Sequence, residues 1–513
     1  MRFLSCLLCA FSLPAALLHA SQPNILLIVS EDNGPELGCY GDPYARTPHL
    51  DRLASEGIRF NRAFVPQAGC SQSRASLLTG LYPHQHGQIG LATWGFRLYR
   101  DDTPNMPRSL KAAGYRTGII GKLHINPESA FPFDFREIPG ANFARRRLSD
   151  YSQHAETFIS ASNAPFFLSV NYPDAHDPWL RQVDGLPELP HTGVEVRAMP
   201  YLGMDPPGMR EMVADYYNSL GRLDACVGEL LAVLDRSGKA DNTLVIYMGD
   251  HGADMLRGKR TCYEGGLRIP LILRWPDHVK PQVREELVST IDLMPTLLAV
   301  AAAEPVPVLP GRPLQPLFDN SAAAADWRAR LFAEYHTHGG TANYFPQRSV
   351  RTERFKLIEN LLPGTVHPDF DVTLGKLTKE AKARAIPGGL DLATEIKGAG
   401  PDVSAAYALM RRPPRFELYD LQADPHEFRN LADLPEYAAI LSELSQSLVS
   451  WRKETSDPLL DSDNLRRLTA EVAAITDKSQ GKQLNWGYPD YFFGREPVRP
   501  VASPGKKRGR KKL

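Results

Sequence analysis

Short, continuous apolar runs alternate with helical segments through residues 22–300. Runs that lack an interleaved polar face indicate strands buried on both sides of a mostly parallel sheet, with helices covering it. We therefore predict an α/β fold with a large, mostly parallel sheet sandwiched by helices. The predicted strands cover residues 24–29, 117–120, 165–170, 243–248 and 270–273, and the longest predicted helix covers residues 209–234.

The pattern changes near residue 301, where alanine and proline accumulate ahead of a set of shorter strands. Those strands are predicted at residues 331–335, 348–351, 354–358 and 416–419, followed by a helix at residues 434–453. The second and third of them read as a hairpin that turns at Thr352-Glu353. We expect a large domain over residues 21–325 and a smaller C-terminal α+β domain with an antiparallel sheet over residues 326–485.

The two ends of the chain have different compositions from the rest. Residues 1–20 carry Arg2, then an apolar stretch and a small residue, Ala20, as in a secretory signal peptide. The apolar stretch is too short for a comfortable membrane span, so we predict export to the periplasm or the extracellular space and no integral membrane segment. Residues 486–513 finish in a run of basic residues and are predicted to form a low-complexity tail.

The charge balance and the cysteine count exclude some classes of protein. Lys plus Arg and Asp plus Glu both number 59, so no overall charge favours nucleic acid or an anionic membrane as a partner. Beyond the leader, only Cys39, Cys70, Cys226 and Cys262 remain, which is too few for a disulfide scaffold in an exported chain of this length.

Cys70 opens a short predicted helix that ends at Gly80. At a helix N-terminus the unpaired N–H groups and the helix dipole favour negative charge. Arg74 follows one turn later on the same side and adds a full positive charge. A lone cysteine at such a position is more often a small buried side chain, but the Cys-x-x-x-Arg spacing favours a site for an anion.

Two acidic pairs follow predicted strands. The first strand runs into Glu31-Asp32, and the strand at residues 243–248 runs into Asp250-His251. In an open α/β sheet ligands bind beyond the carboxyl ends of the strands, and carboxylates there can share one hard cation. Each pair alone is about as well explained by helix capping or turn formation. A cation site is the better hypothesis when an anion site is predicted beside it.

Other strand ends carry bases and acids. One delivers Lys122 and His124, another delivers Asp174 and His176, and Lys259 follows Asp250 in a glycine-bearing loop. Taken singly, each lysine is a solvated charge and each histidine a hydrogen-bonded loop residue. Their repeated occurrence at strand ends predicts one shared catalytic site.

These residues carry a resemblance to a known family. The chain resembles the type I, formylglycine-dependent sulfatases of the alkaline-phosphatase-like superfamily through nearly its whole length after the leader. The resemblance rests on residues 24–32, 70–80, 118–124, 249–252, 263–266 and 417–427. Residues 73–81, 116–122, 132–135 and 165–168 are most similar to the sulfamidase branch, the heparan N-sulfatases.

The resemblance implies a mechanism and a set of roles. A maturation enzyme would oxidise Cys70 to formylglycine, whose hydrate attacks sulfur, and a divalent metal, Ca²⁺ in preference to Mg²⁺, would balance the charge. The implied metal ligands are Glu31, Asp32, Asp250, His251 and residue 70 itself. The implied catalytic residues are Cys70, Arg74, Lys122, His124, His176 and Lys259, with His124 deprotonating the hydrate and His176 serving the leaving group. The resemblance also implies that Asp174 touches the substrate. His338 and Arg348 are further candidate substrate contacts, because they lie in residues 335–348, one of the variable loops expected to recognise the leaving group.

The chain departs from the family pattern at three positions. Gln72 stands where the family has proline, Glu31 stands where it has aspartate, and His251 stands where asparagine is common. If maturation needs the proline, Cys70 remains a thiol and the protein is hydrolytically silent. We prefer the hypothesis that the maturation enzyme accepts Gln72, because a suitable residue stands at every other functional position of the family.

Several functions remain open at this stage. The leading hypothesis is an exported hydrolase of N-sulfate or O-sulfate groups on a sulfated carbohydrate. The alternatives are a phosphodiesterase or phosphonate hydrolase of the same superfamily, and a catalytically silent protein that binds sulfated glycans. A simple cysteine hydrolase is disfavoured because it would leave the acidic pairs without a role.

Overall fold

The computed structural model describes residues 22–140, 147–319, 324, 326–340, 343–386, 389–475 and 484–492. The predicted leader and residues 493–513 of the predicted tail lie outside these ranges. Within them, a nine-stranded sheet has the order β4-β3-β5-β1-β6-β7-β2-β8, and β9 pairs with β2. Its strands are β1 Asn24–Ser30, β2 Ile58–Phe64, β3 Arg116–Gly121, β4 Phe135–Glu137, β5 Phe166–Tyr172, β6 Thr243–Gly249, β7 Arg268–Arg274, β8 Gln282–Arg284 and β9 Val288–Ser289.

The centre of this sheet is parallel, as predicted. β1 pairs in parallel with β5 and β6, and β3 with β4 and β5. Every residue of β1, β5 and β6 is buried, which explains their continuous apolar runs. β7 runs antiparallel to both β6 and β2. We did not predict β2, because Arg59, Asn61 and Arg62 interrupt its apolar residues.

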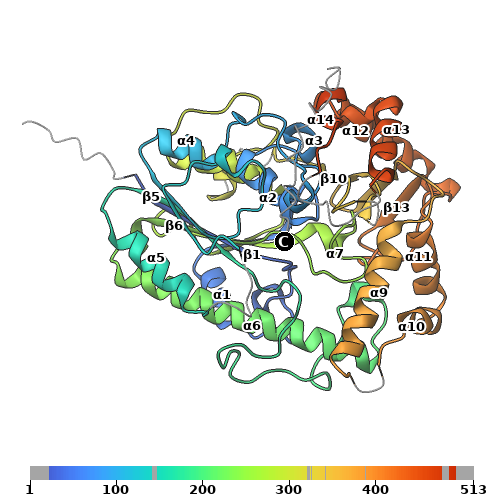
Figure 1. The fold of residues 1–513 in the computed structure, drawn as a ribbon, viewed down its shortest axis with the longest axis horizontal. Helices are drawn as coiled ribbons and strands as arrows, with labels where there is room; N and C mark the ends of the chain where they lie inside the picture. Colours follow the sequence, from blue (N-terminus) through green and yellow to red (C-terminus); the bar gives the residue numbers. More distant parts are fainter. Residues whose placement is uncertain are drawn as a thin grey trace, which may run out of the picture.

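Helices cover both faces of the sheet, which confirms the predicted sandwich. α1 (Pro48–Ser55), α5 (Asp150–Ser160) and α6 (Pro207–Arg236) lie on one face (Figure 1). α2 (Cys70–Thr79) and α4 (Met106–Ala112) lie on the other, and α8 (Leu293–Val300) packs against both of them. The short helices α3 (Pro83–His86) and α7 (Glu264–Leu267) complete this part of the chain. None of the helices in the described ranges is long and apolar enough to span a bilayer.

The C-terminal part contains the predicted antiparallel sheet, in the order β10-β11-β12-β13. Its strands are β10 Leu331–Tyr335, β11 Gln347–Arg351, β12 Phe355–Asn360 and β13 Phe416–Asp420. Its helices are α9 Pro368–Ala383, α10 Leu392–Gly398, α11 Pro401–Arg411, α12 Ala438–Glu454, α13 Ser462–Ala473 and α14 Tyr488–Tyr491. Only α12 was predicted among these helices. In α9 Gly375 interrupts the apolar spacing, so no clear helical period marks this segment.

The boundary predicted for the tail needs correction. Trp486 and Tyr488, which fall inside the predicted tail, are buried and join an aromatic cluster with Phe96. The short helix α14, which falls in the predicted tail, therefore packs onto the body of the protein. Aromatic residues just ahead of the basic run were the sequence signal for this packing.

Candidate active site

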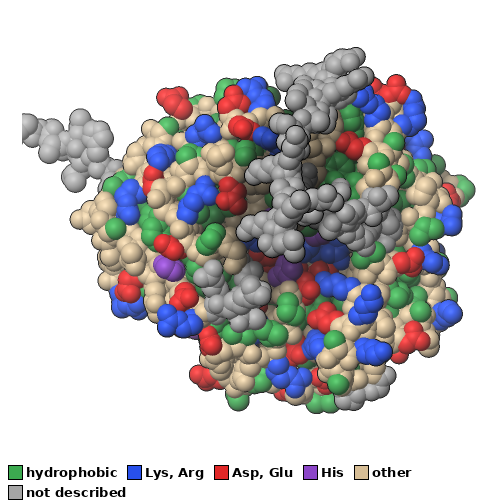
Figure 2. Space-filling model, viewed as in Figure 1, with side chains coloured by type: hydrophobic (Ala, Val, Ile, Leu, Met, Phe, Trp, Pro, Cys, Tyr) green, Lys and Arg blue, Asp and Glu red, His purple; other side chains and the backbone are tan. Residues whose placement is uncertain are grey.

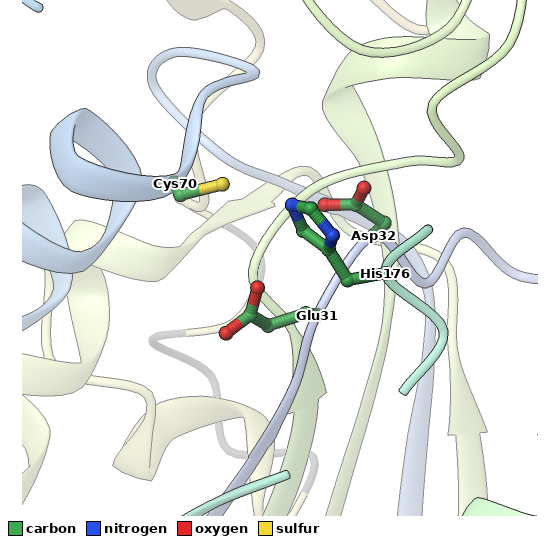
Figure 3. Close-up of side chains that lie close together, drawn as sticks. All are labelled: Glu31, Asp32, Cys70 and His176. Carbon is green, nitrogen blue, oxygen red and sulfur yellow. The ribbon is translucent and has the colours of Figure 1, made fainter. Parts of the chain in front are cut away.

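The predicted site residues of the large sheet converge at one edge of it. β1 leads into Glu31 and Asp32, and β6 leads into Asp250 and His251. β3 and β5 end just before Lys122 and the Asp174–His176 segment, and α2 begins at Cys70. Figure 3 shows the Cys70 sulfur and the His176 ring turned toward one another, with both carboxylates nearby. Figure 2 shows histidine, basic and acidic side chains together at the centre of the face drawn there.

The acidic residues and two histidines form two overlapping groups of candidate metal ligands. Ligand atoms of Glu31, Asp32, Cys70 and His176 lie within 4.8 Å of one another, and so do those of Cys70, Asp250 and His251. His251 Nε2 is 3.3 Å from Asp32 Oδ1 and 3.6 Å from Asp250 Oδ1. The set is rich in oxygen with one or two imidazoles, which suits a hard divalent cation.

Two details of this group fit a bound cation. His251 Nδ1 lies 2.9 Å from the Gly252 carbonyl and donates its proton there, which leaves Nε2 as the ring atom that faces the carboxylates. Burial lowers the pKa of His251, but Asp250 and Asp32 outweigh it and raise that pKa to about 9, so a bound cation would take the place of the Nε2 proton. Glu31 Oε1 is buried without a hydrogen-bond partner among the described residues. A buried carboxylate oxygen of this kind normally has a partner, and a cation would supply one.

Three basic side chains surround the same point. Lys122 Nζ donates to Glu31 Oε2 at 2.7 Å, and Lys259 Nζ donates to both oxygens of Asp32 at 2.9 and 3.0 Å. Arg74 donates to Asp250 Oδ2 at 3.2 Å and contacts Glu31 at 3.6 Å. Burial raises the pKa of Glu31, but Lys122 and Arg74 outweigh it and bring that pKa to about 2.

Cys70 is positioned for chemistry rather than simple packing. It is the first residue of α2, and Gly80 closes that helix at φ 71° with its N–H on the Ser76 carbonyl, as expected from the sequence. Burial raises the pKa of the Cys70 thiol, but Lys122, Lys259 and His251 lower it well below its usual range. A side chain at this position can therefore carry negative charge at neutral pH.

The two catalytic histidine candidates have opposite electrostatics. Burial lowers the pKa of His176, but Asp32 outweighs it and raises the pKa to about 10. Burial and the Lys122 charge lower the pKa of His124 to about 3. Both ring nitrogens of His124 are buried without a hydrogen-bond partner among the described residues, whereas His176 Nδ1 lies 2.7 Å from the Asp177 carbonyl. In the described structure His176 is charged and His124 is neutral at pH 7.

Not all of the predicted substrate-contacting side chains are free to bind a substrate. Arg348 is fully buried, and its guanidinium donates twice to Asp457 at 2.8 Å. The expectation that Arg348 contacts substrate is therefore wrong, and Arg348 has a structural role. The strand at residues 348–351 was predicted, but the complete burial of β11 was not evident from the sequence. His338 is only partly buried, and burial together with the Lys259 charge lowers its pKa well below the usual value. Its contact with substrate stays a prediction.

Asp174 also has a partner that our sequence analysis did not identify. Both of its oxygens accept from Arg222 of α6 at 2.8 Å, and the two side chains are buried. Such a two-bond pair fixes the segment that carries His176. Arg222 lies on the buried face of α6, between Leu220 and Leu223. An arginine on an apolar helix face indicates a buried ion pair, so this contact could have been predicted.

A second set of residues missed in the sequence lies beside His176. Lys376 of α9 donates to Asp254 at 2.6 Å and pairs with Asp177 at 3.0 Å. Asp254 also pairs with Arg260, in the loop that carries Lys259. Because α9 was not predicted, no sequence signal connected Lys376 to this loop.

The fold and this site define the sulfatases as the class to which the chain is most similar, and three comparisons agree. The family described as Sulfatase matches residues 23–303, and the family described as N-sulphoglucosamine sulphohydrolase, C-terminal, matches residues 249–371. The human protein named N-sulphoglucosamine sulphohydrolase is 33% identical over 493 residues, covering 88% of this chain and 94% of the relative. An ulvan-active sulfatase of Formosa agariphila is 27% identical, covering 86% of this chain and 82% of the relative.

Solved structures agree on the fold. One described as a complex with its substrate D-glucosamine-2-N,6-O-disulfate superposes with a TM-score of 0.63 at 21% identity, covering 85% of this chain and 99% of that one. The phosphonate monoester hydrolase of Agrobacterium radiobacter superposes with a TM-score of 0.62 at 19% identity, covering 84% and 96%. The chain belongs to the sulfatase family and is a hydrolase of sulfate esters or sulfamates.

Proposed function

We propose that this protein is an exported sulfatase that removes N-sulfate or O-sulfate groups from a sulfated carbohydrate. Its relatives include a protein named N-sulphoglucosamine sulphohydrolase and sulfatases named as active on ulvan. An N-sulfated glucosamine unit is the specific substrate that we favour, because the 33% identical relative and the second matching family carry that name.

A divalent cation would be held by Glu31, Asp32, Asp250 and His251, together with residue 70. The oxygen-rich set and the unpartnered Glu31 oxygen support this assignment, with Ca²⁺ preferred and Mg²⁺ second. When bound, the cation supplies fixed positive charge near the sulfuryl oxygens. Arg74, Lys122 and Lys259 add charge from three sides, and such preorganised groups stabilise the anionic transition state.

Residue 70 would act after a maturation enzyme converts Cys70 to formylglycine, whose hydrate supplies the oxygen that bonds to sulfur. Arg74 and the first turn of α2 orient that oxygen and offset its charge. The start of α2 is formed without the family's proline, because Gly69 lies extended at φ −164° and the chain enters the helix at Cys70. Gln72 is compatible with the site geometry in this respect.

Each of the two histidines would carry out one of the two proton transfers. Asp32 favours the protonated form of His176, which would donate its proton to the departing nitrogen or oxygen of the sugar. His124 is neutral with a free ring nitrogen and would accept the proton of the second hydroxyl of residue 70, which releases sulfate and restores the aldehyde. Asp174 orients the His176 segment through Arg222, and His338 would contact the substrate.

The observation that carries this proposal is the convergence of Cys70, the acidic residues and three basic side chains at one sheet edge. To test it, the protein is produced in its native host and the residue-70 peptide is analysed by mass spectrometry. Sulfate release is then measured from N-sulfated and O-sulfated disaccharides, with a phosphodiester as control and Cys70→Ala as the inactive reference. Aldehyde at residue 70 with sulfate release supports the proposal, whereas an unmodified thiol in an active enzyme contradicts it.

A further inference from the structure

A loop next to the start of α2 lies at the edge of the candidate site. Leu91 N–H donates to the His338 carbonyl at 2.9 Å, and Ala92 N–H donates to Ser71 Oγ at 2.9 Å. The loop is thereby tied to the neighbour of Cys70 and to His338 itself. Trp94 lies two residues further on, in a short 3₁₀ turn (Ala92–Trp94), and its indole packs against the backbone that follows His338.

The indole of Trp94 rests on two glycines. A Cβ atom added at Gly339 would lie 2.5 Å from Trp94 Cδ1 and Nε1, and one added at Gly340 would lie 3.0 Å from Cζ3. Only residues without side chains allow the ring to pack so closely on the backbone that follows His338. One side of the ring is supported in this way while the side chain remains partly exposed.

The C-terminal segment Leu484–Phe492 fixes the position of this loop. Trp486 Nε1 donates to the Trp94 carbonyl at 2.7 Å, and its ring stacks on Phe96 with 4.2 Å between centroids. The Tyr488 hydroxyl donates to the Gly87 carbonyl at 2.6 Å and accepts from Arg97 N–H at 3.3 Å.

The same segment is anchored to the C-terminal domain. The Tyr491 hydroxyl donates to Glu471 of α13 at 2.7 Å, and Gly487 N–H donates to the other oxygen of that carboxylate. The segment thus connects α13 to the Trp94 loop. We call Leu484–Phe492 the strap.

We infer that Trp94 is a sugar-contacting, specificity-determining residue, and that the strap positions it. This inference rests on the proposed function and deepens it. Aromatic rings supply large, rigid contact area, and ligand pockets use them together with a few polar groups that fix orientation. The sugar ring that carries the sulfate would lie against the exposed side of the indole, with His338 beside it. A small aryl sulfate would reach Cys70 without this contact.

Variants of Trp94 test the sugar contact. For Trp94→Ala we expect KM for the sulfated disaccharide to rise about tenfold, as for removal of a buried tryptophan anchor, with kcat changed little. KM for 4-nitrophenyl sulfate should stay the same, and Trp94→Phe should restore most of the affinity for the disaccharide. Equal losses on both substrates, or no loss on the disaccharide, would overturn the assignment.

A matched pair of variants tests the strap. Tyr488→Phe and Tyr491→Phe each remove one hydroxyl from α14, but only the first hydroxyl contacts the Trp94 loop. Amide hydrogen exchange over residues 89–99 should speed up about tenfold in Tyr488→Phe and stay unchanged in Tyr491→Phe. Equal exchange in the two variants would overturn the positioning role. This readout needs no substrate, so it separates failure of the strap from failure of the proposed function.

Discussion

Nε2 of His251 lies 3.4 Å from Sγ of Cys70, across the point where the acidic residues converge. With its Nδ1 proton on the Gly252 carbonyl, His251 can offer only Nε2 to this point. The residue that departs from the family's common asparagine therefore still presents one ligand atom in the right direction.

Replacing His251 should weaken metal binding. For His251→Ala we expect the Ca²⁺ affinity of the chelator-treated protein to fall by more than about 100-fold. Loss of a residue that only hydrogen-bonds to a metal ligand typically costs roughly 10- to 100-fold, and loss of a ligand itself should cost more. Isothermal titration calorimetry measures this change in affinity. In the wild-type protein, adding Ca²⁺ or Mg²⁺ after chelation should restore the activity. His154→Ala on the surface of α5 is the control. Unchanged Ca²⁺ affinity in His251→Ala would exclude this residue as a ligand.

Loss of the His176 proton should matter most for poor leaving groups. If His176 donates the proton to the leaving group, His176→Asn should lower kcat on sulfamates and sugar sulfates by about 10²- to 10⁴-fold. On 4-nitrophenyl sulfate the loss should be small, since nitrophenolate departs without a proton. His124→Asn should instead slow both substrates to a similar extent. Parallel losses for His176→Asn on both kinds of substrate would rule out the leaving-group role.

The Gln72 side chain makes a contact that proline could not make. Gln72 is fully buried and its Nε2 donates to the Thr337 carbonyl at 2.6 Å. Gln72→Pro should therefore lower the free energy of unfolding by about 1–3 kcal/mol, since that carbonyl loses its closest donor, while the first turn of α2 tolerates proline.

Calorimetric unfolding and mass spectrometry of residue 70 separate the two effects of this change. The thermal midpoint should fall, and the formylglycine fraction should be at least as high as in the wild type. Gln72→Met is the control, since it keeps the volume and loses the donor, and it should show the same destabilisation. A Gln72→Pro variant as stable as the wild type would show that the hydrogen bond contributes nothing.

The parts of the fold that sequence could predict are those with a single, uninterrupted pattern. β1, β5 and β6 are buried on both faces, so their apolar runs were unambiguous and their ends located Glu31, Asp32 and Asp250. β2 begins with alternating residues, but the alternation breaks at Asn61 and Arg62, where the register with β7 shifts between Phe60 and Ala63. No single period therefore covers this strand.

The site could be predicted only as far as its residues follow strands or open a helix. Lys376 reaches the site from α9, more than a hundred residues from Asp254 in sequence, and only the packing of the C-terminal part brings the two together. The same limit explains Arg348. From sequence, an arginine in a hairpin is expected to be an exposed cation. Its buried partner, Asp457, lies 109 residues away, so the ion pair could not be predicted.

The Arg348–Asp457 pair should make stability depend on pH in the acid range. Burial raises the pKa of Asp457, but the guanidinium of Arg348 outweighs it and lowers that pKa below its usual value. A carboxylate with a lowered pKa in the folded state contributes stability that is fully present above its unfolded pKa of about 3.9. That contribution is lost as the pH falls further, because the unfolded chain takes up the proton first. Arg452 donates to the same carboxylate at 2.7 Å, so two buried cations depend on it.

Asp457→Asn should therefore lower stability at pH 7 by about 3–5 kcal/mol, since it leaves Arg348 buried without its counter-charge. Thermal midpoints measured by calorimetry between pH 7 and pH 3 should show the gap to the wild type narrowing below about pH 4. Asp420→Asn is the matched control, because its partner Arg354 is exposed and the loss should stay at or below about 1 kcal/mol. A gap for Asp457→Asn that stayed constant down to pH 3 would show that the Asp457 carboxylate does not titrate differently in the folded and unfolded chains.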